Sequence, residues 1–211
     1  MCEILAVREY IKKTAPPGGA SRVEIRRQRE QVTAERPISD GVRFGPVDMG
    51  GVVAERLETD GADANRAIIH LHGGGYVFGS PTTHRTISTY LAAKANVPVY
   101  LVDYRLAPEH PYPAALEDGL TAFAWLEAQG LAPSAIAVSG DSAGGGLALS
   151  LSLTRAAREQ ALPSSLLLQS PWTDLSCTFD TYDMLDGVDP TVTRQRLLDM
   201  AAMYVGDGGN L

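Results

Sequence analysis

Cysteine is scarce in this chain, and long hydrophobic segments are missing. Cys2 and Cys177 are the only cysteines among 211 residues and form no C-x-x-C pair, which excludes a disulfide framework and predicts two free thiols. No apolar run is long enough to span a membrane. The first residues mix charges with apolar side chains, so they do not resemble a signal peptide. A cytoplasmic protein is therefore expected.

Excess positive charge and nucleotide-binding patterns are also lacking. The formal net charge is −7, which disfavours nucleic acid and anionic membranes as partners. Neither G-x-G-x-x-G nor G-x-x-x-x-G-K-[ST] occurs, so the glycine-rich segments are not phosphate loops of those kinds. The composition is that of a globular protein, 45% hydrophobic and 20% charged, at a length that forms one domain with a sizeable core.

Strand-like and helix-like segments alternate from about residue 46 onward. This alternation favours an α/β fold in which a parallel sheet carries helices on both faces. After the last expected strand no further strand is found, so the sheet looks unfinished at that edge. The expected strands are 46–57, 67–71, 97–102, 135–139 and 165–169, and the expected helices are 84–95, 114–129, one running through 147–154, and 191–205.

Two helices are expected before the sheet. Residues 3–13 predict a short helix that ends at the Pro-Pro-Gly-Gly segment 16–19. Ser21 and Glu24 have the spacing of a capping box, which begins a charged helix that ends near Glu35. The second helix is too polar to belong to the core, so we interpret it as a lid.

The chain is accordingly divided into a cap and a core. We assign residues 1–45 to N-terminal cap helices and residues 46–211 to the core. The last part of the core, at about 176–211, is assigned to a second cap segment.

Gly140-Asp141-Ser142-Ala143-Gly144 lies between a β-type run and a helical segment. In that context G-x-S-x-G is typical of a nucleophile elbow, a tight turn that lifts a serine hydroxyl above the end of its strand. The flanking positions need glycine because side chains would not fit. The N–H of Ala143 points into the same space, where the start of a helix favours a developing negative charge. A chance G-x-S-x-G in a glycine-rich loop is the alternative, which the strand–helix context disfavours.

His72-Gly73-Gly74-Gly75 follows the apolar run 67–71. Glycines in this place let backbone N–H groups face a substrate oxygen that side chains would block. Removing one such donor typically costs about 3 kcal/mol of transition-state stabilisation. The alternative is a glycine-rich turn without a function. The two motifs support each other because each follows a strand of the same expected sheet.

Four segments resemble a known family, the hormone-sensitive-lipase family of α/β-hydrolases, in its microbial esterase branch. The likeness covers most of the chain. The segments are HGGGYVFGS (72–80), VDYRLAPEHPYPAALEDG (102–119), SGDSAGGGLAL (139–149) and SPWTDL (170–175).

The resemblance implies an α/β-hydrolase fold that hydrolyses short acyl esters without metal or cofactor. Ser142 is then the nucleophile, and the oxyanion hole is formed by the N–H groups of Gly74, Gly75 and Ala143. The family also leaves a homodimer open for the full-length form. The residues implied to support the two motifs are His72, Gly73, Gly140, Asp141 and Gly144.

The family's acid and histidine follow the serine in the chain, and here the sequence departs from the pattern. We interpret the sequence as the N-terminal part of a hydrolase, truncated before the last strands. All four histidines precede Ser142, namely His70, His72, His84 and His110. None of five aspartates after Ser142 lies in the family's acid motif, and we interpret these five as solvated lid charges: Asp183, Asp186, Asp189, Asp199 and Asp207.

Chain order alone does not exclude an upstream histidine as the base. A base must reach the serine hydroxyl and needs a partner that orients it. His72 resembles a loop-stabilising histidine that bonds to the backbone, and His70 is expected to pack within its strand. His84 and His110 resemble helix-cap and loop residues. We therefore expect none of the four to be the base.

The expected function is that of a serine carboxylic-ester hydrolase acting through an acyl-enzyme, with a histidine outside this sequence moving the proton. Without the histidine, turnover falls by on the order of a million-fold. Two alternatives stay open: a non-catalytic protein that binds acyl or carboxylate ligands, and one half of a split enzyme. Tyr10, Ile11 and Met203 of the lid are expected to set the length of the acyl chain.

Overall fold

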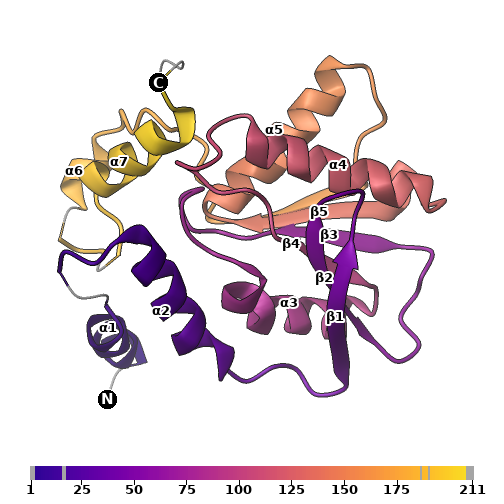
Figure 1. Cartoon of the computed structure of the whole chain (residues 1–211), viewed down its shortest axis with the longest axis horizontal. Helices are drawn as coiled ribbons and strands as arrows, with labels where there is room; N and C mark the ends of the chain where they lie inside the picture. Colours follow the sequence, from indigo (N-terminus) through magenta and orange to yellow (C-terminus); the bar gives the residue numbers. More distant parts are fainter. Residues whose placement is uncertain (1–2, 16–17, 186, 190, 208–211) are drawn as a thin grey trace.

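The computed structural model describes residues 3–15, 18–185, 187–189 and 191–207. A sheet with helices on both faces forms the body of the molecule, and further helices gather at one end of it (Figure 1). Three expectations lie outside the described residues: the free thiol of Cys2, the helix break at Pro16-Pro17 and the solvated charge of Asp186.

Six strands of the described chain form one sheet in the order β1-β2-β4-β3-β5-β6. β4, β3, β5 and β6 are parallel, as expected, whereas β1 pairs antiparallel with β2 and β2 pairs antiparallel with β4. The expected α/β fold is confirmed, with a mixed rather than a wholly parallel sheet. The strands are β1 (Val42–Asp48), β2 (Val53–Thr59), β3 (Ala67–Leu71), β4 (Val99–Val102), β5 (Ile136–Asp141) and β6 (Ser165–Gln169).

The segment 46–57, expected as one strand, contains the end of β1, a turn and part of β2. Gly50 and Gly51 have φ of 77° and 94°, and the Gly51 N–H donates a hydrogen bond to Asp48 Oδ1 at 2.5 Å. Two glycines in the left-handed region reverse the chain, so the segment folds back as a hairpin. Apolar residues continue on both sides of the turn, which is why the sequence pattern did not separate the strands.

Helices cover both faces of the sheet, as expected. α3 (Pro81–Ala95) covers one face, and α4 (Ala114–Ala128) and α5 (Ala143–Ala157) cover the other (Figure 1). A short 3-10 turn (Pro133–Ala135) leads into β5. Because side chains alternate along a strand, Ile68 of β3 belongs to the buried cluster on the α3 face and Ile69 to the larger cluster on the opposite face. All five residues of β3 are buried, and burial of each of its three larger aliphatic side chains, Ile68, Ile69 and Leu71, contributes about 1.5–3 kcal/mol.

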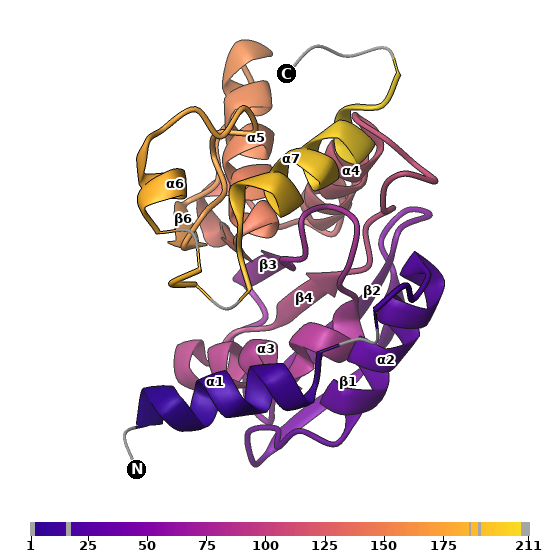
Figure 2. The ribbon, with the colours of Figure 1, turned by 90° about the vertical axis from the view of Figure 1, so that its left-hand side faces the viewer.

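The helices α1 (Glu3–Lys13) and α2 (Arg22–Ala34) lie at one end of the molecule with α6 (Thr181–Met184) and α7 (Arg194–Val205) (Figures 1 and 2). The expected capping box of α2 is present, formed by Ser21 and Glu24. α2 buries none of its residues. Arg26 anchors it by donating to Val77 O and Ala107 O, both at 2.8 Å, and by pairing with Glu109.

α7 is packed more firmly than α2. It buries Leu197, Ala201 and Tyr204. The Tyr204 ring stacks on Tyr76 with 3.8 Å between ring centroids, and the Tyr204 carbonyl accepts a hydrogen bond from the Tyr112 N–H at 2.6 Å. Because Tyr76 directly follows the glycine motif, α7 lies close to that motif.

The sheet edge at β6 is apolar and open among the described residues. β6 pairs with β5 alone in this part of the chain, and Leu167 on it is 47% exposed. Cys177 is a buried free thiol, as expected. None of the helices within the described ranges is both long enough and apolar enough to cross a membrane.

Candidate active site

Ser142 lies between β5 and α5, where the chain turns sharply from the strand into the helix. Its backbone has φ 51° and ψ −119°, a strained conformation that costs about 1–3 kcal/mol for a residue with a side chain. Three backbone hydrogen bonds hold this turn: the Ser142 N–H donates to Gln169 O, and the Ser142 carbonyl accepts from Gly146 and Trp172. This conformation matches the strained strand-to-helix turn of a nucleophile elbow.

The glycines on either side of the serine permit close packing of backbone on backbone. A side chain at Gly140 would collide with the Gly144 carbonyl, and one at Gly144 would collide with the Leu71 carbonyl at the end of β3. Leu71 and Gly140 are opposite each other in the parallel pairing of β3 and β5. The serine turn therefore lies directly against the start of the glycine segment 72–75.

Near this turn, the backbone N–H groups of Gly74, Gly75 and Ala143 donate no hydrogen bond to any described residue, and the same holds for Gly144 and Gly145 in the first turn of α5. Ala143 begins α5, and the first N–H groups of a helix have no partner within it. Gly74 and Gly75 have φ of 126° and 66°, which favours glycine. Met200 of α7 occupies the space that a side chain at Gly75 would need. Unpaired N–H groups beside a helix start are suited to an oxyanion.

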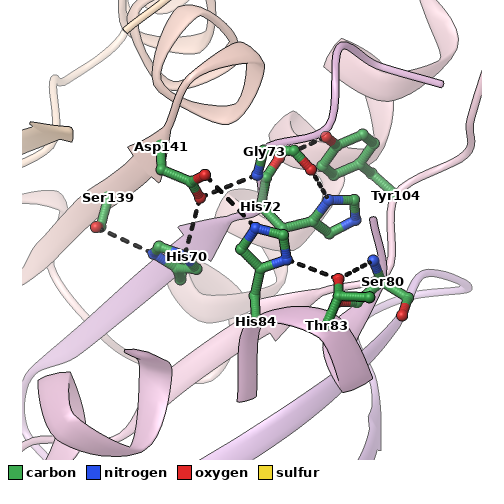
Figure 3. A network of polar contacts seen from close by, with 9 residues as sticks. All are labelled: His70, His72, Gly73, Ser80, Thr83, His84, Tyr104, Ser139 and Asp141. Atoms are coloured by element: carbon green, nitrogen blue, oxygen red, sulfur yellow. Dashed lines mark hydrogen bonds and ion pairs between the residues drawn. The ribbon is translucent and has the colours of Figure 1, made fainter. Parts of the chain in front are cut away.

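Asp141 connects the two glycine motifs (Figure 3). Its Oδ1 accepts a hydrogen bond from the Gly73 N–H at 2.9 Å, His84 Nε2 lies 3.5 Å from Oδ2, and His70 Nε2 lies 3.7 Å from Oδ1. Burial raises the pKa of this carboxyl, but its contacts with His84, His70 and the Gly73 N–H outweigh burial and lower the pKa overall. The carboxylate is therefore charged at neutral pH and ties the glycine segment to the serine turn.

His70 and His72 are buried and neutral. Burial lowers the pKa of His70 to about 4 and the pKa of His72 to about 3. His70 Nδ1 lies 3.1 Å from Ser139 Oγ, and His72 Nδ1 lies 2.9 Å from the Gly73 carbonyl. The His72 ring also stacks on Tyr104, whose hydroxyl donates to the His72 carbonyl at 2.6 Å (Figure 3). His72 thus bonds to the backbone of its own loop, as the sequence interpretation expected.

No histidine nitrogen in the described part of the chain forms a hydrogen bond with the Ser142 hydroxyl. His84, in the first turn of α3, lies 2.8 Å from Thr83 Oγ1 through Nδ1 and faces Asp141 through Nε2. His110 lies in an exposed loop. Within the described ranges, no group of three or more His, Cys, Asp or Glu side chains is arranged to hold a metal ion.

A cavity of about 780 Å³ opens beside the glycine motifs, between the sheet and the helices α1, α2 and α7. Gly73, Gly74 and Asp141 line its sheet side. Tyr10 and Ile11, which we expected to contact an acyl chain, line its helical side, but Met203 does not. The cavity reaches only as far as Met200 along α7, and Met203 lies almost a turn beyond it, packed against the core.

Comparison with known proteins decides the family. Residues 68–211 match a protein family described by the α/β-hydrolase fold. The chain is 35% identical to a solved esterase from the bacterial hormone-sensitive lipase family, with a TM-score of 0.93 over 99% of this chain and 70% of that one. The chain belongs to the hormone-sensitive-lipase family of α/β hydrolases. The family inferred from the motifs is therefore confirmed.

Two curated relatives match this chain over only part of their own length. An esterase of Acinetobacter venetianus is 41% identical over 145 residues, which are 69% of this chain and 48% of that protein. An acetyl-hydrolase of Streptomyces hygroscopicus is 37% identical over 157 residues, which are 74% of this chain and 50% of that protein. The chain thus spans about half the length of these relatives.

Sequence reasoning missed the histidines that face Asp141. The approach of His70 could have been predicted in part, because β3 and β5 were both expected as strands. His70 lies opposite Ser139, and Asp141 follows Ser139 by two residues. His84 gave no such signal, since only the packing of α3 against the sheet brings it to the carboxylate. The contact between Met200 and Gly75 was missed for the same reason.

Proposed function

We propose that the whole protein is a serine carboxylic-ester hydrolase that cleaves short-chain acyl esters through an acyl-enzyme. Ser142 is the nucleophile, and the N–H groups of Gly74, Gly75 and Ala143 hold the oxyanion. One observation carries the proposal: the strained turn at Ser142 lies beside backbone N–H groups that have no acceptor among the described residues. The relatives named as an esterase and an acetyl-hydrolase support an ester substrate.

In the proposed reaction, Ser142 Oγ attacks the ester carbonyl carbon while its proton passes to a base. The carbon–oxygen bond to the alcohol breaks, the alcohol leaves with that proton, and water then releases the acid from the serine. Each oxyanion donor stabilises the transition state by about 3 kcal/mol. Asp141 keeps the glycine segment in place through its hydrogen bond with Gly73.

The base is not one of the four histidines of this chain. His70 and His72 are buried and neutral, and their Nδ1 atoms contact Ser139 and the Gly73 carbonyl. His84 faces Thr83 and Asp141, and His110 lies in an exposed loop. We propose that the proton acceptor is a histidine outside these 211 residues. The greater length of the relatives supports this.

The cap belongs to the same proposal. Residues 1–45 form an N-terminal cap over the core 46–211, and the last part of that core, about 176–211, forms a second cap segment. The cavity wall shared by α1, α2 and α7 supports this division.

A second candidate is a protein that binds acyl or carboxylate ligands without turnover, or one half of an enzyme that a second polypeptide completes. The observation that favours it is the lack of a hydrogen bond between any described histidine and Ser142.

Covalent labelling tests the nucleophile. We expect a fluorophosphonate to modify Ser142, as mapped by peptide mass spectrometry, and the label to be absent from Ser142→Ala. Ser150→Ala is the matched control because Ser150 is exposed on the same helix. Labelling with hydrolysis of p-nitrophenyl butyrate supports the hydrolase, and ligand binding without either supports the second candidate. Equal labelling of Ser142→Ala contradicts the assignment.

A further inference from the structure

The cavity beside the glycine motifs is lined by more cationic than anionic side chains, although the whole chain has a net charge of −7. The two carboxylates of its lining already have polar partners, since Asp141 contacts Gly73 and His84 and Asp199 accepts from Gln195. The cations among the described lining residues are Lys12, Arg29, Arg36 and Arg196. Three of these cations also have polar partners, since Lys12 pairs with Glu9, Arg36 donates to the Tyr10 hydroxyl and Arg196 donates to the Thr191 carbonyl. Arg29 is the cation of this lining that has no hydrogen-bond or ion-pair partner among the described residues, so an anionic ligand group suits the cavity there.

Arg29 is the cation best placed to meet such a group. Its guanidinium carbon lies 4.5 Å from the centre of the Phe78 ring, which fixes the charge by a cation–π contact. No carboxylate of the described residues pairs with it, whereas Arg26, one turn earlier on α2, pairs with Glu109 at 2.8 Å. Arg29 is an exposed residue, so an anion can approach its guanidinium from solvent. An anion in the cavity would supply the partner that the protein does not.

Arg29 shares its cavity with part of the glycine segment, whereas Ser142, Gly75 and Ala143 are not among the described lining residues. The Phe78 N–H donates to the Gly74 carbonyl at 2.9 Å, and the Phe78 carbonyl fills the space beside Gly74. Arg29, Gly73 and Gly74 line the same cavity. Its volume of about 780 Å³ is in the range of small-molecule sites, roughly 300–1,000 Å³. A ligand can therefore reach the glycine segment with one end and the guanidinium with the other.

We propose that this cavity selects esters that carry a second, free carboxylate, such as the monoesters of short dicarboxylic acids, and that Arg29 is the specificity-determining residue. The inference rests on the proposed hydrolase function for the ester end of the ligand. The guanidinium binds the free carboxylate through two N–H donors, a geometry that arginine offers and lysine does not. Neutral esters of the same length lack this contact.

Ligand binding tests the preference without requiring turnover. Monomethyl glutarate and dimethyl glutarate are titrated calorimetrically into the Ser142→Ala chain, which leaves the cavity lining unchanged. We expect the monoester to bind roughly tenfold more tightly than the diester, as a charge-assisted hydrogen bond implies. In Arg29→Gln the two ligands should bind alike. Arg27→Gln is the matched control, because Arg27 is exposed on the same helix and does not line the cavity.

The outcomes separate this inference from the proposed function. A monoester preference that disappears with Arg29→Gln and survives Arg27→Gln supports the inference, even where no Ser142-dependent hydrolysis is found. Equal affinity for both ligands, no binding of either at millimolar concentration, or equal effects of the two arginine substitutions overturns it. Ser142-dependent hydrolysis of neutral esters would in those cases leave the hydrolase proposal intact.

Discussion

Residues on the sheet side of the cavity are fixed by close packing, whereas the helix on the other side is attached by the hydrogen bonds and ion pair of one side chain. On the sheet side, all five residues of β3 are buried, and the turn at Ser142 is packed so closely that Gly140 and Gly144 have no room for side chains. On the helical side, α2 buries no residue and is attached through the hydrogen bonds and ion pair of Arg26. The proposed chemistry thus depends on rigid backbone, and the proposed selectivity depends on side chains of a surface helix. Substitutions on the two sides should differ accordingly.

The largest difference is expected between two glycine substitutions. Gly144→Ala places a methyl group against the Leu71 carbonyl, while Gly18, before α2, has no atom within 4 Å of the equivalent position. Alanine improves helix propensity by about 1 kcal/mol at best, which is too little to offset a backbone clash. We expect urea unfolding to show a loss of about 3 kcal/mol or more for Gly144→Ala and under about 0.5 kcal/mol for Gly18→Ala. Equal losses of stability in the two variants would contradict the proposed difference between the sheet side and the helical side.

Acid should destabilise the sheet side through its two buried histidines, His70 and His72. The pKa of His70 is about 4 in the folded protein against an ordinary value of 6.5, so the unfolded chain takes up a proton that the folded chain resists. Stability is therefore complete above pH 6.5 and falls as the pH approaches 4. At about 1.4 kcal/mol per pKa unit, His70 accounts for a loss of about 3 kcal/mol, and His72, whose pKa is about 3, adds a loss of similar size over the same pH range. The lowered pKa of Asp141 acts in the same direction at lower pH.

Urea unfolding across this pH range measures the effect. His70→Gln should make the profile about half as steep, because His72 still contributes, whereas His110→Gln, in an exposed loop, should leave it unchanged. A wild-type profile that is already flat between neutral pH and pH 4 would contradict the lowered pKa values of both histidines.

A smaller loss of stability, confined to α2, is expected from a substitution on the helical side. Arg26→Met removes the contacts with Val77, Ala107 and Glu109, and because the pair is partly exposed we expect about 1 kcal/mol. Hydrogen exchange should rise in the amides of α2 while global unfolding changes little. Arg27→Met removes the same charge from an exposed position and should have no effect. Unchanged exchange in Arg26→Met would mean that other contacts hold the helix.

The parts of the site that follow from local sequence were predictable, and those that need tertiary packing were not. Ser142 and the glycines at 74 and 75 stand in short motifs whose backbone geometry depends on neighbouring residues, so strand, turn and helix could be inferred together. The hairpin at Gly50 and Gly51 was missed because apolar residues continue across it. The approach of His84 to Asp141 depends on where α3 docks, which no local pattern encodes. Met200 took the place expected for Met203 because the cavity ends before the last turn of α7.

The most direct test compares the turnover lost on replacing Ser142 with the turnover lost on replacing a histidine. Hydrolysis of p-nitrophenyl butyrate is measured in the protein as its own cells make it, for the wild type, Ser142→Ala and His84→Gln. We expect Ser142→Ala to lower turnover by about a million-fold and His84→Gln by no more than roughly tenfold, because His84 contacts Asp141 and Thr83 rather than the Ser142 hydroxyl. A loss in His84→Gln as large as that in Ser142→Ala would make His84 the base. Turnover unchanged by Ser142→Ala would remove the serine from the reaction, and either result would contradict the proposed mechanism.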